Sequence, residues 1–209
     1  LPDGDEDGDG LQNLQEYILG TDIFNGDTDG DGMPDAAEAL QGFNPVLPTK
    51  VAYVDPVSGD DANTGLSASK PKKTLSAAVT ASMRTGCENI VSAAPGLYTG
   101  AANRGLDFNG FDIKLVAPAG AAQTVVDLEE AGRLLSLSRR ETLDSRLDGF
   151  TVRNGYMASH GTAVHLENAS LDIRDCVFEG NNSGRLVTYE QGIGIGSQWE
   201  DANYTAAVY

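Results

Sequence analysis

Two aspartate-rich stretches near the start of the chain have the residue types and the spacing of a calcium site. They span residues 5–16 and 27–38, and both fit the twelve-residue pattern D-x-[DN]-x-[DN]-G-x5-E. Calcium is a hard cation that takes about six to eight oxygen ligands, and carboxylates at alternate positions of a curled loop can converge on it. One match could arise by chance in an acidic segment, but two complete matches offset by 22 residues indicate two metal loops.

Each loop offers five side chains and one backbone carbonyl as ligands. Position seven contributes only its carbonyl, so an apolar residue is acceptable there. The glycine at position six, Gly10 or Gly32, allows a sharp turn that a side chain would hinder. The candidate ligands are Asp5, Asp7, Asp9, Leu11, Asn13 and Glu16 in the first loop and Asp27, Asp29, Asp31, Met33, Asp35 and Glu38 in the second. We therefore expect two or more Ca²⁺ ions as cofactors.

The negative charge of the chain is concentrated in the same region. The 209 residues carry a formal net charge of −17, and residues 1–49 hold 12 of the 31 acidic side chains and none of the 14 Lys and Arg. An acidic, solvated linker is the alternative interpretation, but carboxylates at this density repel one another unless a cation lies among them. Phosphate binding needs a basic surface, so nucleic acid is not expected as a partner.

The loops are not expected to form paired EF-hands. An EF-hand has a helix on both sides of its loop, whereas residues 20–26, before the second loop, have the composition of a turn. Position eight of that loop is Pro34, which has no N–H to donate to a strand that would pair the loops. Short helices are expected after the loops, over residues 13–19 and 35–41, each ended by a glycine.

The run DGDGLQNLQEYILGTDIFNGDTDGDGMPDAAEALQGFNP resembles bacterial thrombospondin type 3 repeats. The resemblance covers about residues 1–47, and its one departure is Ile23, where such repeats usually have proline after GTD. It implies a calcium-stiffened stalk or spacer in a secreted or cell-surface protein. Calcium modules outside cells bind at about 10⁻⁴–10⁻³ M, which also favours an extracellular location.

Neither a membrane span nor a signal peptide is expected from the sequence. No stretch of about 18 apolar residues occurs. The chain begins at Leu1, within the repeat region, so we expect a processed or fragmentary chain from a secreted protein.

After residue 50 the pattern changes to short runs of strand-forming residues separated by Gly, Asn, Asp and Ser. The predicted strand segments are 90–91, 111–116, 124–126, 134–137, 150–152, 163–166, 171–173 and 176–178. The segments GFTVRNG (149–155) and DCVFEGN (175–181) align at an offset of 26, which stacks Phe150 on Cys176 and Val152 on Phe178. Short strands at such spacing are typical of a solenoid whose inward side chains stack from coil to coil.

One helix is predicted among these strands, over residues 72–82. It follows Pro71, and its residues Leu75, Ala78, Val79 and Ser82 fall on one face. A solenoid exposes backbone and core at its first coil unless that coil is covered. We therefore expect this helix to cap the N-terminal end.

The segments YVDPVSGDDANTGLSASKPKKTLSAAVTAS and ENIVSAAPGLYTG resemble the opening of right-handed parallel β-helix domains of the pectate-lyase-like superfamily. The resemblance covers about residues 51–183. It implies a mainly β fold, a right-handed parallel β-helix with an N-terminal cap helix, preceded by a small module of calcium loops and short helices. The expected domains are 1–48 and 49–209, the second incomplete at its C-terminus.

Four coils are expected, followed by the start of a fifth over residues 185–209. The four lie near residues 88–100, 106–127, 133–155 and 161–182. Cys87 and Cys176 would then be about 14 Å apart along the axis, from a spacing of about 4.8 Å per strand, whereas a disulfide needs Cα atoms within about 7 Å. Two free thiols are expected, with Cys176 buried.

Enzymes of the superfamily use acidic calcium ligands and an arginine base on one sheet, and the coils carry residues of these types. They are Asp127, Glu129, Glu130, Arg133, Asp148, Arg153, Asp172, Arg174 and Asp175. The pairs Asp148/Arg153 and Arg174/Asp175 could face outward on neighbouring coils, but an ion-paired exterior is the favoured interpretation. His165 is expected in a strand and His160 in a loop, neither of them catalytic. The acidic loop with Asp60 and Asp61 is a weaker cation candidate.

The preferred function is a structural or adhesive surface protein rather than an enzyme. Residues 191–196 and 205–209 have strand composition without a polar cap, so end-to-end stacking on other copies is one expected partnership, and surface glycans are another. The alternatives are a fragment of a polysaccharide lyase or glycoside hydrolase, and a carbohydrate-binding β-helix without catalysis.

Overall fold

The computed structural model describes residues 2–157 and 161–183. The chain divides into two compact units, Leu1–Lys50 with Arg84–Glu88 and Val51–Met83 with Asn89–Tyr209. The predicted strands and fifth coil after residue 184, and His160, lie outside the described residues.

The first unit consists of the two acidic loops and the helices that follow them. Helix α1 (Asn13–Leu19) ends at Gly20 and helix α2 (Asp35–Gln41) ends at Gly42, both glycines being in the left-handed conformation. These bounds confirm the predicted helices. Residues 20–26, immediately before the second loop, are not helical, as expected.

This first unit has almost no apolar core. Leu11 and Pro45 are the only apolar residues that are buried among its described residues, whereas Tyr17, Ile18 and Phe24 are largely exposed. Three carboxylates, those of Glu16, Asp35 and Glu38, are each 0% exposed. The interior of this unit is therefore acidic where a small domain usually buries apolar groups.

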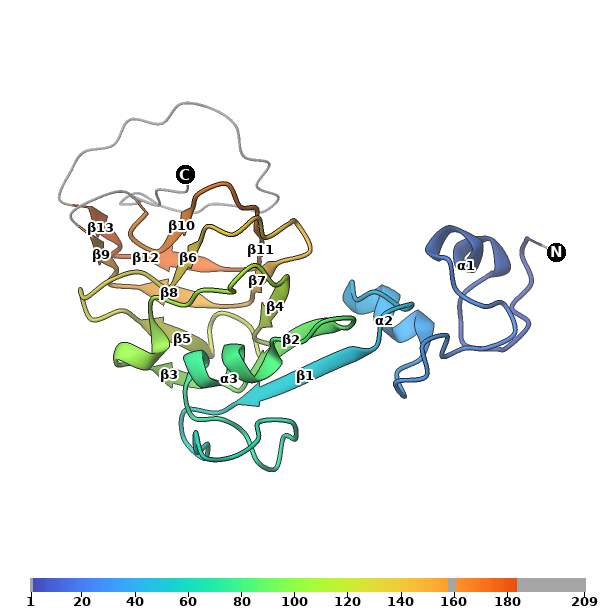
Figure 1. Ribbon diagram of the computed structural model, residues 1–209, viewed down its shortest axis with the longest axis horizontal. Coiled ribbons are helices and arrows are strands. Elements are labelled where there is room, and N and C mark those ends of the chain that lie inside the picture. Colours follow the sequence, from blue (N-terminus) through green and yellow to red (C-terminus); the bar gives the residue numbers. More distant parts are fainter. Residues whose placement is uncertain (1, 158–160, 184–209) are drawn as a thin grey trace. The chain divides into compact units, whose positions relative to one another are not determined.

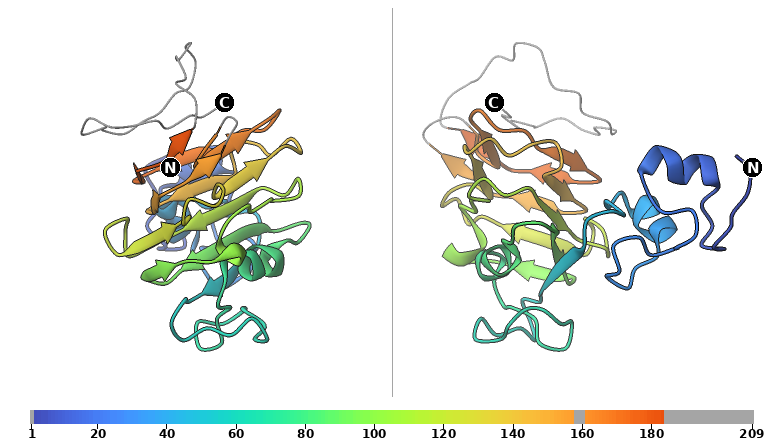
Figure 2. Two further views of the ribbon diagram at one scale, coloured as in Figure 1. Left: turned by 90° about the vertical axis from the view of Figure 1, so that its left-hand side faces the viewer. Right: turned by 45° about the vertical axis from the view of Figure 1, so that its right-hand side comes forward.

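The second unit is a parallel β-helix, as predicted, in which strands of successive coils lie above one another (Figures 1 and 2). One sheet has the order β1-β2-β4-β7-β11 and another the order β12-β8-β5-β3, with the pairs β10-β6 and β13-β9 completing the coils. The strands are β1 (Thr49–Val54), β2 (Glu88–Ala93), β3 (Gly96–Tyr98), β4 (Ile113–Val116), β5 (Thr124–Asp127), β6 (Leu135–Leu137), β7 (Arg146–Asp148), β8 (Thr151–Arg153), β9 (Tyr156–Met157), β10 (Val164–Leu166), β11 (Asp172–Arg174), β12 (Val177–Glu179) and β13 (Asn182–Ser183).

The core consists of inward side chains that align from coil to coil. In the first sheet the register places Val91, Leu115, Leu147 and Ile173 above one another. In the second sheet Tyr98, Val126, Val152 and Phe178 align in the same way. Each of the four predicted coils contributes one strand to both sheets.

The predicted pairing of Val152 with Phe178 at an offset of 26 is confirmed by the register of β8 and β12. The same offset recurs between β5 and β8 and between β7 and β11. The pairs β2/β4, β3/β5 and β4/β7 are offset by 24, 28 and 32 residues, so 26 is not a general period. Strand β7 was not predicted, because its single inward residue, Leu147, lies between Arg146 and Asp148 and shows no apolar run. Cys87 and Cys176 are not joined by a disulfide, and Cys176 packs against the core.

Helix α3 (Leu75–Ser82) covers part of this core. Its four buried residues are the predicted ones: Leu75, Ala78, Val79 and Ser82. The helix contacts β4 and the short 3-10 helix η1 (Ala101–Asn103). Its N-cap, Thr74, accepts a hydrogen bond from the Ala77 N–H, which satisfies one of the free donors of the first turn.

The core predicts a contrast between two leucines close in sequence. Leu147 is 0% exposed between Leu115 and Ile173, whereas Leu143, in the preceding turn, is 71% exposed. Leu147→Ala should lower the free energy of unfolding by about 2–5 kcal/mol, because it leaves a cavity in the stack. Leu143→Ala, the matched control, should change it by less than about 0.5 kcal/mol. Urea denaturation followed by circular dichroism measures both, and equal effects would contradict the assigned core.

Candidate metal centre

The first acidic loop curls around its own carboxylates. Oxygens of Asp5, Asp7 and Asp9 all lie within 4.8 Å of one another. The loop is held by N–H donors from its own backbone, including Gly8 to Asp5 (2.8 Å) and Leu11 to Asp9 (2.7 Å). The glycine at position six, Gly10, has a φ of 107°, in the region that L side chains rarely adopt. Local structure therefore brings three predicted ligands together.

Helix α1 adds two more predicted ligands to the same loop. Asn13 and Glu16 lie three residues apart and so share one face of the helix. The Oδ1 atom of Asn13 and both carboxylate oxygens of Glu16 are buried and have no hydrogen-bond partner in the structure. Burial raises the pKa of Glu16, and the nearby carboxylates of Asp7 and Asp9 raise it further. Buried oxygens without hydrogen-bond partners, close to three aspartates, are the kind of ligand that a hard cation binds.

The second loop repeats this arrangement. Oxygens of Asp27, Asp29 and Asp31 also lie within 4.8 Å of one another, and Gly32 has a φ of 100°. Buried oxygens without partners occur again, on Asp29 Oδ2 and Glu38 Oε2. Burial raises the pKa of Asp29 despite a hydrogen bond from the Asp31 N–H.

Position nine distinguishes the two loops. In the first loop the Asn13 oxygen has no partner. In the second loop Asp35 accepts hydrogen bonds on both oxygens, from the N–H (2.8 Å) and the hydroxyl (2.7 Å) of Thr28. The Asp35 carboxylate therefore binds Thr28, at loop position two, a contact that the spacing of the ligands alone did not indicate.

The carbonyl ligands would come from Leu11, which is buried, and Met33, which is half-buried.

The loops also pack on one another. The Asp9 carboxylate accepts a hydrogen bond from the Ala36 N–H at the start of α2 (3.0 Å), and the Asp35 N–H donates to the Gly26 carbonyl (3.0 Å). A Cβ on Gly26 would lie 2.7 Å from the Asp9 Cβ, so only glycine fits there. A predicted ligand of the first loop thus also fixes the helix that belongs to the second.

The weaker cation candidate, Asp60 and Asp61, accepts hydrogen bonds from neighbouring segments. Asp61 accepts hydrogen bonds from the N–H groups of Lys73 (2.8 Å) and Thr74 (2.9 Å) and from the Thr74 hydroxyl (2.9 Å). Asp60 accepts one from the Ala62 N–H (2.9 Å). Among residues 2–157 and 161–183, groups of three or more acidic side chains close enough to share a metal occur only in the two loops.

Charged residues on the β-helix pair mainly between neighbouring rungs, where a rung is one coil of the helix. Arg153 lies 3.0 Å from Asp127 and 3.9 Å from Glu179, its register neighbours on either side, rather than pairing with Asp148. Asp172 lies 2.7 Å from Arg174, which was expected beside Asp175, and it also contacts Arg146 of the rung below (3.3 Å). Burial raises the pKa of Asp148. These contacts favour the ion-paired exterior over a catalytic group.

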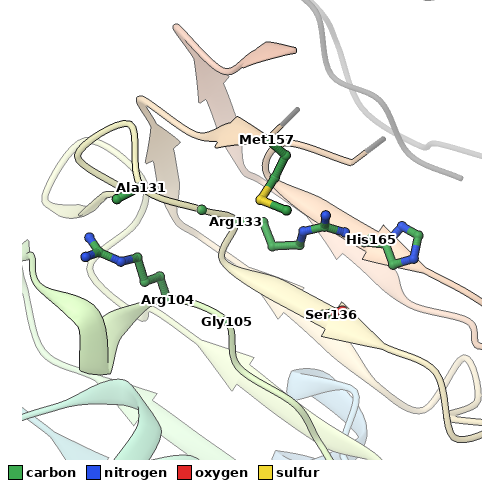
Figure 3. A pocket seen from close by; sticks show the side chains of 8 residues that line it. Arg104, Gly105, Ala131, Arg133, Ser136, Met157 and His165 are labelled. Carbon is green, nitrogen blue, oxygen red and sulfur yellow. The ribbon is translucent and has the colours of Figure 1, made fainter. Parts of the chain in front are cut away.

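A hollow of about 470 Å³ lies over β6 and β10 (Figure 3). It is lined by Arg104, Gly105, Ala131, Gly132, Arg133, Ser136, Met157 and His165. Ser136 and His165 are register neighbours, which confirms His165 as a strand residue. Arg104 is engaged by Glu129 at 2.8 Å. No carboxylate belongs to the described lining, so a pair of acids for glycosidic bond cleavage is not assembled there.

The electrostatics of the second loop predict a pH dependence in the absence of calcium. Burial, together with Asp29, Asp31 and Asp35, raises the pKa of Glu38 from 4.5 to about 7, although a hydrogen bond from Thr49 opposes the shift. A carboxyl group whose pKa is raised in the folded state contributes to stability at pH values below its ordinary pKa of 4.5. This contribution is lost as the pH rises through about 7.

When calcium is removed with a chelator, the protection of the α2 amides against hydrogen exchange should therefore fall as the pH rises from 4.5 to 7. Glu38→Gln should flatten this dependence, because the amide carries no charge at any of these pH values. Hydrogen–deuterium exchange corrected for the intrinsic rate measures both proteins. The same slope in the variant would mean that another group titrates.

No match to this chain is found among profiles of known protein families, curated proteins or solved structures. Within the described residues, none of the helices has the length and apolar character needed to cross a membrane.

Proposed function

We propose that the chain is a calcium-binding structural protein of the cell surface or extracellular space, in which two Ca²⁺ ions hold the tandem loops rigid. The observation that carries this proposal is Glu16, whose carboxylate is 0% exposed and has no hydrogen-bond partner on either oxygen. An isolated buried carboxylate is strongly disfavoured. A bound calcium ion supplies both the opposite charge and the partner for these oxygens.

The residues that would hold the ions are those of the loop template. Three aspartates and one glutamate contribute charge at positions one, three, five and twelve of each loop, and position nine adds Asn13 in the first loop and Asp35 in the second. Asp9, hydrogen-bonded to Ala36, would transmit the rigidity of the first loop to α2. In this proposal the ions replace an extensive apolar core, since Leu11 and Pro45 are the only buried apolar residues among those described in this unit.

For the β-helix we propose a role as a surface for stacking on other copies or for contacts with glycans. Its parallel rungs and ion-paired exterior support a rigid scaffold. The alternatives of a lyase or hydrolase fragment, or of a carbohydrate-binding β-helix without catalysis, have less support. Hydrolysis of a glycosidic bond generally needs two carboxyl groups, and the described lining of the hollow contains none. A lyase of the pectate-lyase-like superfamily would need an arginine base, whereas Arg153 and Arg174 are paired with Asp127 and Asp172.

Calcium titration by calorimetry tests the proposal. The full chain should bind two Ca²⁺ ions, with dissociation constants of about 10⁻⁴–10⁻³ M or tighter. Glu16→Gln should abolish or strongly weaken one site and Glu38→Gln the other, because each removes the carboxylate at position twelve. Chelator should lower the melting temperature of the module.

Glu6→Gln is the matched control for these variants. Glu6 is exposed at loop position two, which carries no ligand, so this change removes the same charge from the same loop. It should leave the stoichiometry at two. The absence of calcium binding at millimolar concentration, or equal losses in Glu6→Gln and Glu16→Gln, would overturn the proposal.

A further inference from the structure

Thr49, the first residue of β1, contacts two predicted ligands of the second loop. Its N–H donates to Asp31 Oδ2 at 2.6 Å, and its hydroxyl donates to Glu38 Oε1 at 2.9 Å. Thr49 is 9% exposed and lies eleven residues beyond the end of the loop. The loop template therefore does not include it, and no feature of its sequence surroundings singles it out.

We propose that Thr49 is a positioning residue of the second calcium site, an inference that rests on the proposed function. It holds the carboxylates at loop positions five and twelve with one backbone and one side-chain donor. Residues that orient ligands in this way influence metal affinity although they do not touch the metal.

The position-twelve carboxylates show why Thr49 matters to one loop only. Thr49 occupies Oε1 of Glu38, and Oε2 is buried and has no partner. Glu38 therefore has one oxygen fixed and one available for an ion. In the first loop, both oxygens of Glu16 are without a partner. The two sites are therefore built differently, and removal of the Thr49 hydroxyl should affect only the second.

The coupling also acts in the opposite direction. If the arrangement of Asp31 and Glu38 around Thr49 favours calcium, then bound calcium must favour that arrangement to the same degree. The Thr49 N–H, held by Asp31, should then exchange more slowly with solvent when calcium is present. Exchange of the Thr49 N–H therefore reports whether calcium occupies the second loop.

The test compares Thr49→Val and Thr49→Ser in the Glu16→Gln background, where the second loop is the remaining site. Valine keeps the shape and the backbone N–H but lacks the hydroxyl, whereas serine retains it. Calorimetry should show calcium affinity reduced about tenfold or more by valine and largely restored by serine. Thr80→Val, an exposed change on α3 that also removes a hydroxyl, should leave the affinity unchanged.

A second measurement keeps the inference testable if the valine variant folds poorly. Hydrogen–deuterium exchange on the unmodified chain should show calcium-dependent protection of the Thr49 amide. Unchanged affinity in Thr49→Val, equal losses with valine and serine, or Thr49 exchange independent of calcium would each overturn the role of Thr49. These outcomes leave two-site binding intact, whereas a chain that binds no calcium would overturn the proposed function as well.

Discussion

The first unit depends on how the mutual repulsion of its buried carboxylates is balanced. Glu16, Asp35 and Glu38 are inaccessible to solvent, and each lies near further aspartates. Hydrogen bonds from Thr28 and Thr49 satisfy some of their oxygens, while others have no protein partner. Neutralisation of this charge should therefore stabilise the first unit.

The two units are stabilised by different physical means. In the β-helix, apolar side chains such as Leu115 and Leu147 align from rung to rung. The charged side chains on the outside also pair between neighbouring rungs, as Arg153 and Asp127 do. This stability is largely insensitive to salt and to divalent ions, because it comes from apolar burial. In the first unit apolar side chains such as Tyr17 lie outside, and the interior is polar. Under the proposed function, removal of calcium should therefore act on the first unit and leave the β-helix nearly unchanged.

Local patterns were sufficient to predict much of this structure. Helix bounds followed from Gly20 and Gly42, and the face of α3 followed from residue spacing. Contacts between distant segments could not be predicted. The engagement of Asp35 by Thr28, and the hold of Thr49 on two loop carboxylates, depend on the tertiary path of the chain. The pairing of Arg153 with Glu179 follows the confirmed offset of 26, whereas the pairing of Arg146 with Asp172 involves β7, a strand that was not predicted.

The alignment of inward side chains has a consequence for how much the chain can vary in length. Leu115 follows Val91 by 24 residues, and Leu147 follows Leu115 by 32. Ile173 follows Leu147 by only 26. Part of the difference lies in the turns between strands, such as residues 138–145. Glu141 and Ser145 of that turn are buried, whereas Leu143 and Asp144 are exposed. A foreign peptide grafted into such a turn would be displayed at the surface with the strand register preserved, which makes this β-helix a suitable host for insertions.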